Sequence, residues 1–245
     1  MGERIRPTTL SDMRSAGSAG ASDLVIAIDG PSGSGKSTAA RAVAARLDLR
    51  YLDTGAMYRA LTWWLLERGV DLTDTQWVAD LAPELPLEMS LDPDTCSVCV
   101  DGRPVDLEIR QPVISAAVSE VATNLAVRAE LVRRQQRIAE GGGIVLEGRD
   151  TTTVVVPDAR VRVLLTANEQ ARLSRRALEV RGSDDTQAVD ATRDEVLRRD
   201  RVDSTVAQFM EAPDGVFVVD TSALDAEQTA DAVLELVARQ TGVRA

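Results

Sequence analysis

Histidine is absent from this 245-residue chain, and other reactive residue types are scarce. There is one lysine, Lys36, and there are two cysteines, Cys96 and Cys99. Without histidine the chain can have no Ser-His-Asp triad, no histidine general base and no histidine metal ligand. A lone Cys-x-x-C lacks the second cysteine pair of a zinc site, so we interpret both cysteines as ordinary structural or surface residues.

Long apolar runs and an excess of positive charge are missing as well. No window has the length of a transmembrane helix, and the net charge of −11 argues against nonspecific binding to nucleic acid or anionic membranes. Residues 1–22 are rich in Ser, Gly and Ala and lack the apolar core of a secretion signal, so we expect a flexible tail and a cytoplasmic protein. The remainder is long enough to form one globular domain.

The clearest motif runs from Gly30 to Ser37 and matches the pattern G-x-x-x-x-G-K-[ST]. An apolar strand ending at Asp29 precedes it, and a helical pattern over 39–47 follows, which is the context of a phosphate-binding P-loop. Backbone N–H groups of such a loop bind phosphate oxygens, Lys36 adds a positive charge, and the Ser37 hydroxyl can bind Mg²⁺. The predicted ATP-binding residues are Gly30, Pro31, Ser32, Gly33, Ser34, Gly35, Lys36, Ser37 and Thr38.

Apolar runs alternate with helical patterns along the rest of the chain. This alternation predicts an α/β fold with a five-stranded parallel sheet covered by helices on both faces. Prolines and an Asp-Gly pair interrupt residues 83–106 and predict a small antiparallel insert. The predicted strands after the first are 50–53, 144–146, 161–165 and 216–219, and the predicted helices after the first are 56–68, 113–138 and 225–239.

Residues 168–201 carry many arginines interleaved with acids. A solvated pair of helices with surface ion pairs explains most of these arginines. The alternative is a mobile lid that brings a few of them over bound phosphates. The arginines are Arg172, Arg175, Arg176, Arg181, Arg193, Arg198, Arg199 and Arg201.

Among P-loop proteins, the sequence favours a kinase. Guanine recognition by GTPases uses Asn-Lys-x-Asp, which cannot occur because Lys36 is the one lysine. None of the predicted strands ends in the Asp-Glu pair that is typical of motor ATPases. A compact kinase with two inserted segments is the interpretation that remains.

Four segments together resemble the bacterial cytidylate kinases, in that family's order and spacing. They are Gly30–Ser37, Asp53-Thr-Gly-Ala-Met-Tyr-Arg59, Gly148-Arg-Asp150 with Thr153–Asp158, and Arg199-Asp-Arg-Val-Asp-Ser204. The resemblance runs from about residue 23 to the C-terminus. It implies a nucleoside-monophosphate kinase fold, with an NMP-binding insert over about 83–125 and a lid over about 168–201.

The resemblance also implies the reaction. ATP and Mg²⁺ would phosphorylate CMP or dCMP to CDP or dCDP, in pyrimidine nucleotide metabolism. The acceptor is a phosphate that is already ionised at neutral pH, so the lack of a histidine base is no obstacle. We further expect a monomer that binds neither nucleic acid nor membrane.

The family's functional residues can be carried over by position. Arg59 and Arg149 would hold the CMP phosphate, Arg199 and Asp203 would hold the ribose or its phosphate, and Ser37 would bind the metal. The residues that would read the cytosine edge are Ser119, Arg128 and Asp150. The full CMP-binding set is Asp53, Thr54, Tyr58, Arg59, Ser119, Arg128, Gly148, Arg149, Asp150, Arg199 and Asp203. The catalytic set is Lys36, Arg149, Asp150, Arg199 and Asp203.

Simpler structural roles exist for several of these residues. Arg59 and Arg128 could be solvated on helix surfaces, and Arg149 and Asp150 could form a local ion pair. Helical spacing supplies a test, because Ser119 and Arg128 are about half a turn out of phase on a straight helix. If both face one base, the helix over 113–138 must break, and we predict the break at Thr123-Asn124, where either residue can cap a new helix.

The chain also departs from the family pattern. Val206 stands where the family usually has an arginine, on the same helical face as Arg199, and Arg201 points about 140° away from it. Loss of one charge-assisted hydrogen bond costs about 1.5–3 kcal/mol if nothing replaces it. Thr151-Thr152 likewise replaces the usual Ile-Gly.

We therefore expect an active cytidylate kinase whose phosphate grip is rearranged, with a lid arginine as the replacement. Glu147, at a strand end, is expected to orient a Mg²⁺-bound water. Two alternatives stay open: a kinase for another monophosphate such as UMP, and a nucleotide-binding regulatory protein without turnover.

Overall fold

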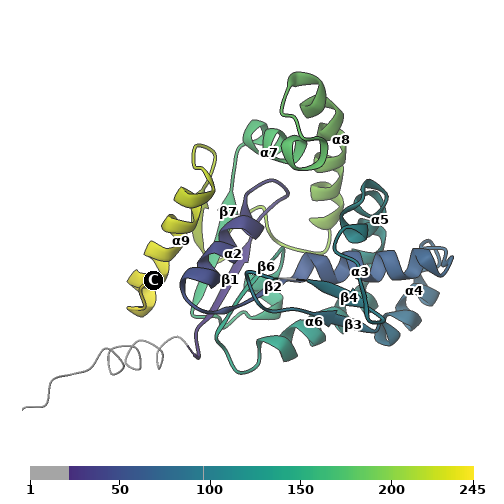
Figure 1. The fold of residues 1–245 in the computed structure, drawn as a ribbon, viewed down its shortest axis with the longest axis horizontal. Helices are drawn as coiled ribbons and strands as arrows, with labels where there is room; N and C mark the ends of the chain where they lie inside the picture. The colour runs from purple at the N-terminus through teal and green to yellow at the C-terminus, as the bar shows by residue number, and fades with distance from the viewer. Residues whose placement is uncertain (1–21, 96) are drawn as a thin grey trace, which may run out of the picture.

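A computed structural model describes residues 22–95 and 97–245 (Figure 1). Its centre is a parallel sheet with the strand order β2-β6-β1-β7-β8, which confirms the predicted fold class. The strands are β1 Val25–Asp29, β2 Arg50–Asp53, β6 Ile144–Gly148, β7 Val161–Thr166 and β8 Phe217–Asp220. The predicted tail, apart from residue 22, and Cys96 lie outside the described residues.

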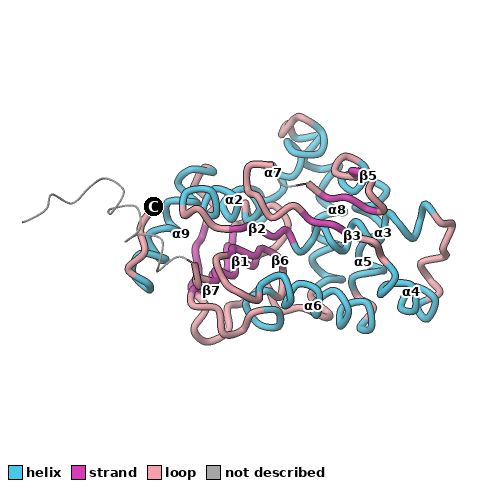
Figure 2. The backbone as a smooth tube through the Cα atoms, turned by 60° about the horizontal axis from the view of Figure 1, so that its bottom comes forward, coloured by secondary structure: helices cyan, strands magenta, loops and turns pink. Residues whose placement is uncertain are grey.

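Both faces of the sheet are buried because apolar residues occupy both sides of its strands. In β6, Ile144 and Leu146 belong to one core cluster and Val145 belongs to the other, as the two-residue period of a strand requires. Helices α2 (Lys36–Arg46) and α9 (Ala226–Thr241) pack on the Val145 side. Figure 2 shows α2 and α6 on opposite sides of the sheet.

The other face carries the helices and the small sheet that follow β2. They are α3 Thr54–Glu67, α4 Thr75–Leu81, the 3-10 turn η1 Ala82–Glu84, the antiparallel strands β3 Leu87–Met89, β4 Val98–Val100 and β5 Arg103–Pro104, the 3-10 turn η2 Glu108–Arg110, α5 Pro112–Ala122 and α6 Leu125–Ala139. The predicted antiparallel insert is confirmed. Helix α4 was not predicted from the sequence. Cys99 lies in β4 and is a free, partly buried thiol.

The predicted helix break at Thr123-Asn124 is confirmed. Helix α5 ends at Ala122, and the side chain of Asn124 caps α6 by accepting hydrogen bonds from the backbone N–H groups of Ala126 at 3.0 Å and Val127 at 3.3 Å. The cap lets the second helix start at a new angle. Arg128 and Ser119 therefore lie on different helices, and Arg128 reaches the cavity described below.

Two further helices project from the carboxyl end of β7 (Figure 1). They are α7 Glu169–Arg181 and α8 Thr186–Asp203, and we call them the arginine-rich helix pair. A single turn of π-helix, η3 Thr151–Val155, follows β6 and was not predicted. Across the part of the chain that the structure describes, no helix is long and apolar enough to cross a membrane.

Candidate active site

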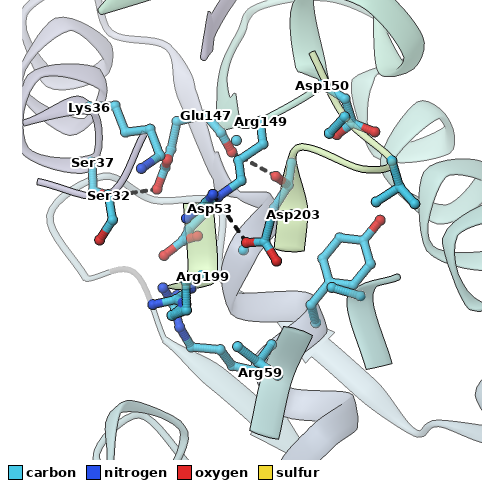
Figure 3. A pocket seen from close by; sticks show the side chains of 18 of the residues that line it. Ser32, Lys36, Ser37, Asp53, Arg59, Glu147, Arg149, Asp150, Arg199 and Asp203 are labelled. Atoms are coloured by element: carbon cyan, nitrogen blue, oxygen red, sulfur yellow. Dashed lines mark hydrogen bonds and ion pairs between the residues drawn. The ribbon is translucent and has the colours of Figure 1, made fainter. Parts of the chain in front are cut away.

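A cavity lies at the carboxyl ends of β1, β2 and β6, and the C-terminal part of α8 contributes Arg199 and Asp203 to its wall (Figure 3). Ligands of parallel α/β sheets bind at this edge because loops and helix N-termini converge there. The predicted site residues that line the cavity are Ser32, Lys36, Ser37, Asp53, Thr54, Tyr58, Arg59, Arg128, Gly148, Arg149, Asp150, Arg199 and Asp203. The other lining residues are Gly55, Val118, Ala122, Glu147, Val206 and Ala207.

The P-loop reaches this edge through left-handed backbone positions at Gly33 and Gly35, with φ of 77° and 85°. Gly33 is also packed against α7, since a Cβ placed on it would lie 2.4 Å from the carbonyl oxygen of Arg172. Helix α2 begins at Lys36, earlier than the predicted residue 39, because Gly35 ends the loop and serves as the N-cap. The N-terminus of α2 thus points its free N–H groups at the cavity, as anion binding requires.

Lys36, Ser37 and Glu147 form the part of the cavity next to the P-loop. The Ser37 hydroxyl donates a hydrogen bond to Glu147 at 2.6 Å, and the ammonium of Lys36 donates to the carbonyl of Pro31 at 3.3 Å. Burial, followed by the negative charge of Asp53, raises the pKa of Glu147 to about 7, while the charge of Lys36 opposes that rise. A hydroxyl beside a carboxylate is a donor set that suits Mg²⁺, which prefers oxygen ligands.

Three arginines, Arg59, Arg149 and Arg199, converge on the other side of the cavity (Figure 3). We call them the acceptor-side arginines. Burial, and then the charges of Arg59 and Arg149, lower the pKa of Arg199, so the cations repel one another. Among the residues that the structure describes, none accepts a hydrogen bond from the buried Nε of Arg199. An anion with several oxygens would relieve the repulsion and supply that acceptor.

Arg149 is held in one orientation by its neighbours. Its Nη1 lies 3.0 Å from a carboxylate oxygen of Asp200 and 3.1 Å from one of Asp203, and its guanidinium stacks over the ring of Phe209 at 4.5 Å. These contacts come from α8 and the segment after it, while Arg149 itself follows β6. The simpler expectation of a local ion pair between Arg149 and Asp150 is therefore wrong.

Of the three residues predicted to read a base, two pair with each other and the third pairs with Asp203. Arg128 makes an ion pair with Asp150, and both side chains are largely buried. Ser119 is buried but is not among the residues that line the cavity, and its hydroxyl donates to Asp203 at 2.9 Å. The idea that Arg128 is merely solvated on a helix surface is wrong. The base-reading role of all three residues stays a prediction.

The arginines of the helix pair differ in their exposure. Arg181, Arg198 and Arg201 are exposed, as a solvated helix pair predicts, and Arg201 points away from the cavity. That expectation is wrong for Arg172 and Arg176, which are buried because α7 packs against the P-loop and α5. The guanidinium of Arg172 donates to the carbonyl of Ser32 at 3.2 Å.

Sequence reasoning missed the role of Asp29. Its fully buried carboxylate accepts the backbone N–H and the hydroxyl of both Thr151 and Thr152, at distances between 2.6 and 2.9 Å. Burial raises the pKa of Asp29, and the four donors oppose that rise. These bonds anchor the loop of Arg149 and Asp150 to β1. The only available signal was the departure from the family pattern at Thr151-Thr152.

The chain is similar over most of its length to proteins of one family. The family model described as Cytidylate kinase matches residues 26–239. A cytidylate kinase of Cutibacterium acnes is 48% identical over 219 residues, which cover 88% of this chain and 96% of the relative. That of Rhodococcus jostii is 48% identical over 228 residues, covering 90% and 97%. That of Streptomyces avermitilis is 42% identical over 218 residues, covering 87% and 92%.

Proposed function

Because the chain belongs to the cytidylate kinase family, we propose that it transfers the γ-phosphoryl group of ATP to CMP or dCMP, giving ADP and CDP or dCDP. The observation that carries this proposal is the meeting of two cationic sites in one cavity. The P-loop with Lys36 forms one of them, and the acceptor-side arginines form the other. Two phosphate-bearing substrates can thus be held with their reacting groups facing each other.

The donor nucleotide would occupy the P-loop. Its phosphates would accept hydrogen bonds from the loop N–H groups and the N-terminus of α2, with Lys36 near the transferred group. Ser37 and Glu147 would hold Mg²⁺, which when bound supplies positive charge to the phosphates of ATP. The Ser37 hydroxyl donates a hydrogen bond to Glu147, so the lone pairs of its oxygen remain for the metal.

The acceptor nucleotide would place its phosphate among Arg59, Arg149 and Arg199. The acceptor oxygen is already ionised, so the residues need only orient it and offset its charge, and no proton has to be removed. Helix α8 contributes Arg199 and Asp203 to the cavity wall, and the arginine-rich helix pair would exclude the water that competes with CMP for the phosphoryl group.

Selection of cytosine would rest on Arg128 and Asp150. A carboxylate can accept from the exocyclic amine of cytosine while a guanidinium donates to the ring carbonyl. Uracil presents a carbonyl in place of that amine, which would face the buried carboxylate of Asp150. A buried carboxylate without a hydrogen-bond donor would weaken the binding of UMP by several-fold to many-fold. CMP is therefore favoured over UMP.

The finer assignments follow from the same proposal. Residues 83–125 would form the NMP-binding insert and residues 168–201 the lid. We propose a monomer, because side chains of one chain line the cavity, and a cytoplasmic enzyme, because ATP and CMP are available there. Light scattering after size-exclusion chromatography tests the oligomeric state.

A panel of nucleoside monophosphates tests the activity. Each would be incubated with the full chain, ATP and Mg²⁺, and ADP release would be followed. We expect turnover with CMP and dCMP at sub-millimolar concentrations and much weaker turnover with UMP. Loss of activity in Lys36→Met serves as the control for a contaminating kinase. ATP binding without turnover of any monophosphate would contradict the proposal.

A further inference from the structure

One carboxylate, that of Asp200, lies where the P-loop, the loop after β6 and the arginine-rich helix pair meet. Its Oδ1 accepts hydrogen bonds from the backbone N–H of Ser32 at 3.2 Å and from Nη1 of Arg149 at 3.0 Å. Its Oδ2 accepts a hydrogen bond from Nη1 of Arg172. Asp200 is 5% exposed, so these protein donors take the place of water around a charged group.

The three partners belong to segments with different tasks. Ser32 is part of the loop that would bind ATP, Arg149 is one of the acceptor-side arginines, and Arg172 lies on α7. Asp200 is therefore bonded at the same time to the donor side and to the acceptor side of the cavity.

The backbone of Ser32 is held from both sides. Its N–H donates to Asp200, and its carbonyl accepts from Arg172, which is itself bonded to Asp200. These three residues close a ring of contacts around the backbone of one P-loop residue. When phosphates order the loop, the ring transmits that order to the carboxylate.

Asp200 in turn fixes the orientation of Arg149. It shares Nη1 of that arginine with Asp203, so two carboxylates of α8 set the direction of the guanidinium. Removing Asp200 would leave Arg149 with one carboxylate partner, Asp203, beside the ring of Phe209. With one carboxylate fewer the guanidinium is less restrained, and the acceptor phosphate would then have to order it at a cost in affinity.

We propose that Asp200 is a positioning residue that couples nucleotide binding at the P-loop to the orientation of Arg149, so that ATP and CMP bind with positive cooperativity. This inference rests on the proposed function. Each nucleotide orders contacts that the other needs, which makes the coupling reciprocal. The loop N–H, the two guanidiniums and the carboxylate are the parts that carry it.

Calorimetric titration of CMP into the full chain, with and without Mg²⁺ and a nonhydrolysable ATP analogue, measures the coupling. In the wild-type chain we expect the analogue to lower the Kd of CMP by about 5-fold or more, within the usual range of coupling between sites. In Asp200→Asn the ratio of the two Kd values should fall to about one. Asp200→Glu keeps the charge and should restore part of the ratio.

Asp194→Asn is the matched control, because Asp194 lies exposed on the same helix and is not among the cavity residues. It should keep the wild-type ratio, and thermal unfolding would verify that each variant is folded. If Asp200→Asn does not fold, Arg172→Gln opens the same ring of contacts from α7 and should also lower the ratio.

Two results would overturn the inference while leaving the proposed function intact. One is a wild-type chain that binds CMP equally well with and without the analogue. The other is a folded Asp200→Asn, or Arg172→Gln if that variant is used, that keeps the wild-type ratio. A wild-type chain that binds no CMP at all would instead contradict the proposed function, and the inference would fall with it.

Discussion

Glu147 occupies the buried end of β6 with a hydroxyl on one side and an ammonium nearby. It is 2% exposed, and its carboxylate accepts a hydrogen bond from the Ser37 hydroxyl and interacts with the charge of Lys36. Burial removes water from the Glu147 carboxylate, and the negative charge of Asp53 repels it. The ionised form of Glu147 is therefore disfavoured. Glu147 thus lowers the stability of the folded chain, and its carboxylate provides a site that suits a cation.

The pH dependence of stability tests this reading of Glu147. The pKa rises from 4.5 to about 7 on folding, so between these values the folded chain keeps a proton that the unfolded chain loses. The Glu147 contribution to the free energy of unfolding should therefore fall as pH rises from about 5 to 7, by at most about 1.4 kcal/mol per pH unit.

Glu147→Gln stays neutral in both states and provides the comparison. Urea unfolding of the nucleotide-free wild type and variant at pH 5, 6, 7 and 8 would show the variant gaining relative stability up to about pH 7. Above pH 7 the difference should stay constant. A difference that is the same at every pH would contradict the raised pKa.

At the scale of elements, two short features decide where the acceptor-side residues lie. The π-helical turn η3 is tied to β1 by Asp29, and this tie holds the loop that carries Arg149 and Asp150. The cap at Asn124 starts α6 at the angle that brings Arg128 to Asp150. Neither feature binds substrate, yet each sets the geometry of residues that would.

Thr152→Val tests the contribution of η3. The change removes one hydroxyl bond to the buried carboxylate of Asp29 and keeps the side-chain shape, so we expect a loss of about 1.5–3 kcal/mol in the free energy of unfolding. A rise in KM for CMP should accompany it. Thr153→Val, at the neighbouring half-buried position, should change neither value appreciably. Equal losses in both variants would show that the Asp29 bond is not responsible.

Asn124→Ala tests the cap of α6. Loss of the cap should cost about 1 kcal/mol of stability and, because Arg128 lies in the first turn, should raise the KM for CMP. The Asn124 amide also donates to the carbonyl of Thr75 at 2.7 Å, so Asn124→Ser is the better reference, since serine caps but does not make that bond. Chemical denaturation and steady-state kinetics of both variants separate the two effects.

At the scale of the whole molecule, charge is distributed unevenly. The chain has a net charge of −11, yet Lys36 and the acceptor-side arginines face one cavity. Grouping cations in a buried place is unfavourable in the empty protein, as the lowered pKa of Arg199 indicates. Bound phosphates would neutralise them, so ligand binding should be strongly linked to stability.

Thermal unfolding with added CMP measures that linkage. At a CMP concentration of 100 times its Kd, the free energy of unfolding should rise by about 2.7 kcal/mol, because the ligand binds only the folded state. Cytidine lacks the phosphate and should stabilise far less at the same concentration. If cytidine stabilises as much as CMP, the acceptor-side arginines do not form a phosphate site.

Patterns within short windows were sufficient to predict much of the fold. The P-loop, the apolar strands and the helix break at Asn124 depend on neighbours a few residues apart, whose spacing reports backbone geometry directly. Helix α4 was missed because its seven residues are too few to show a helical period, although Asp74 caps it. The turn η3 was missed because its ties to Asp29 come from a distant strand.

The sequence by itself determined that this chain has a phosphate-binding loop, a parallel sheet and the motifs of a cytidylate kinase. Only the tertiary structure decided which charged residues are buried together. Asp29 and Thr151 are 122 positions apart, and Ser32 and Asp200 are 168 apart, so no local pattern reports that they bond. Helical spacing shows which face a residue occupies, but the partner across that face depends on how the elements pack.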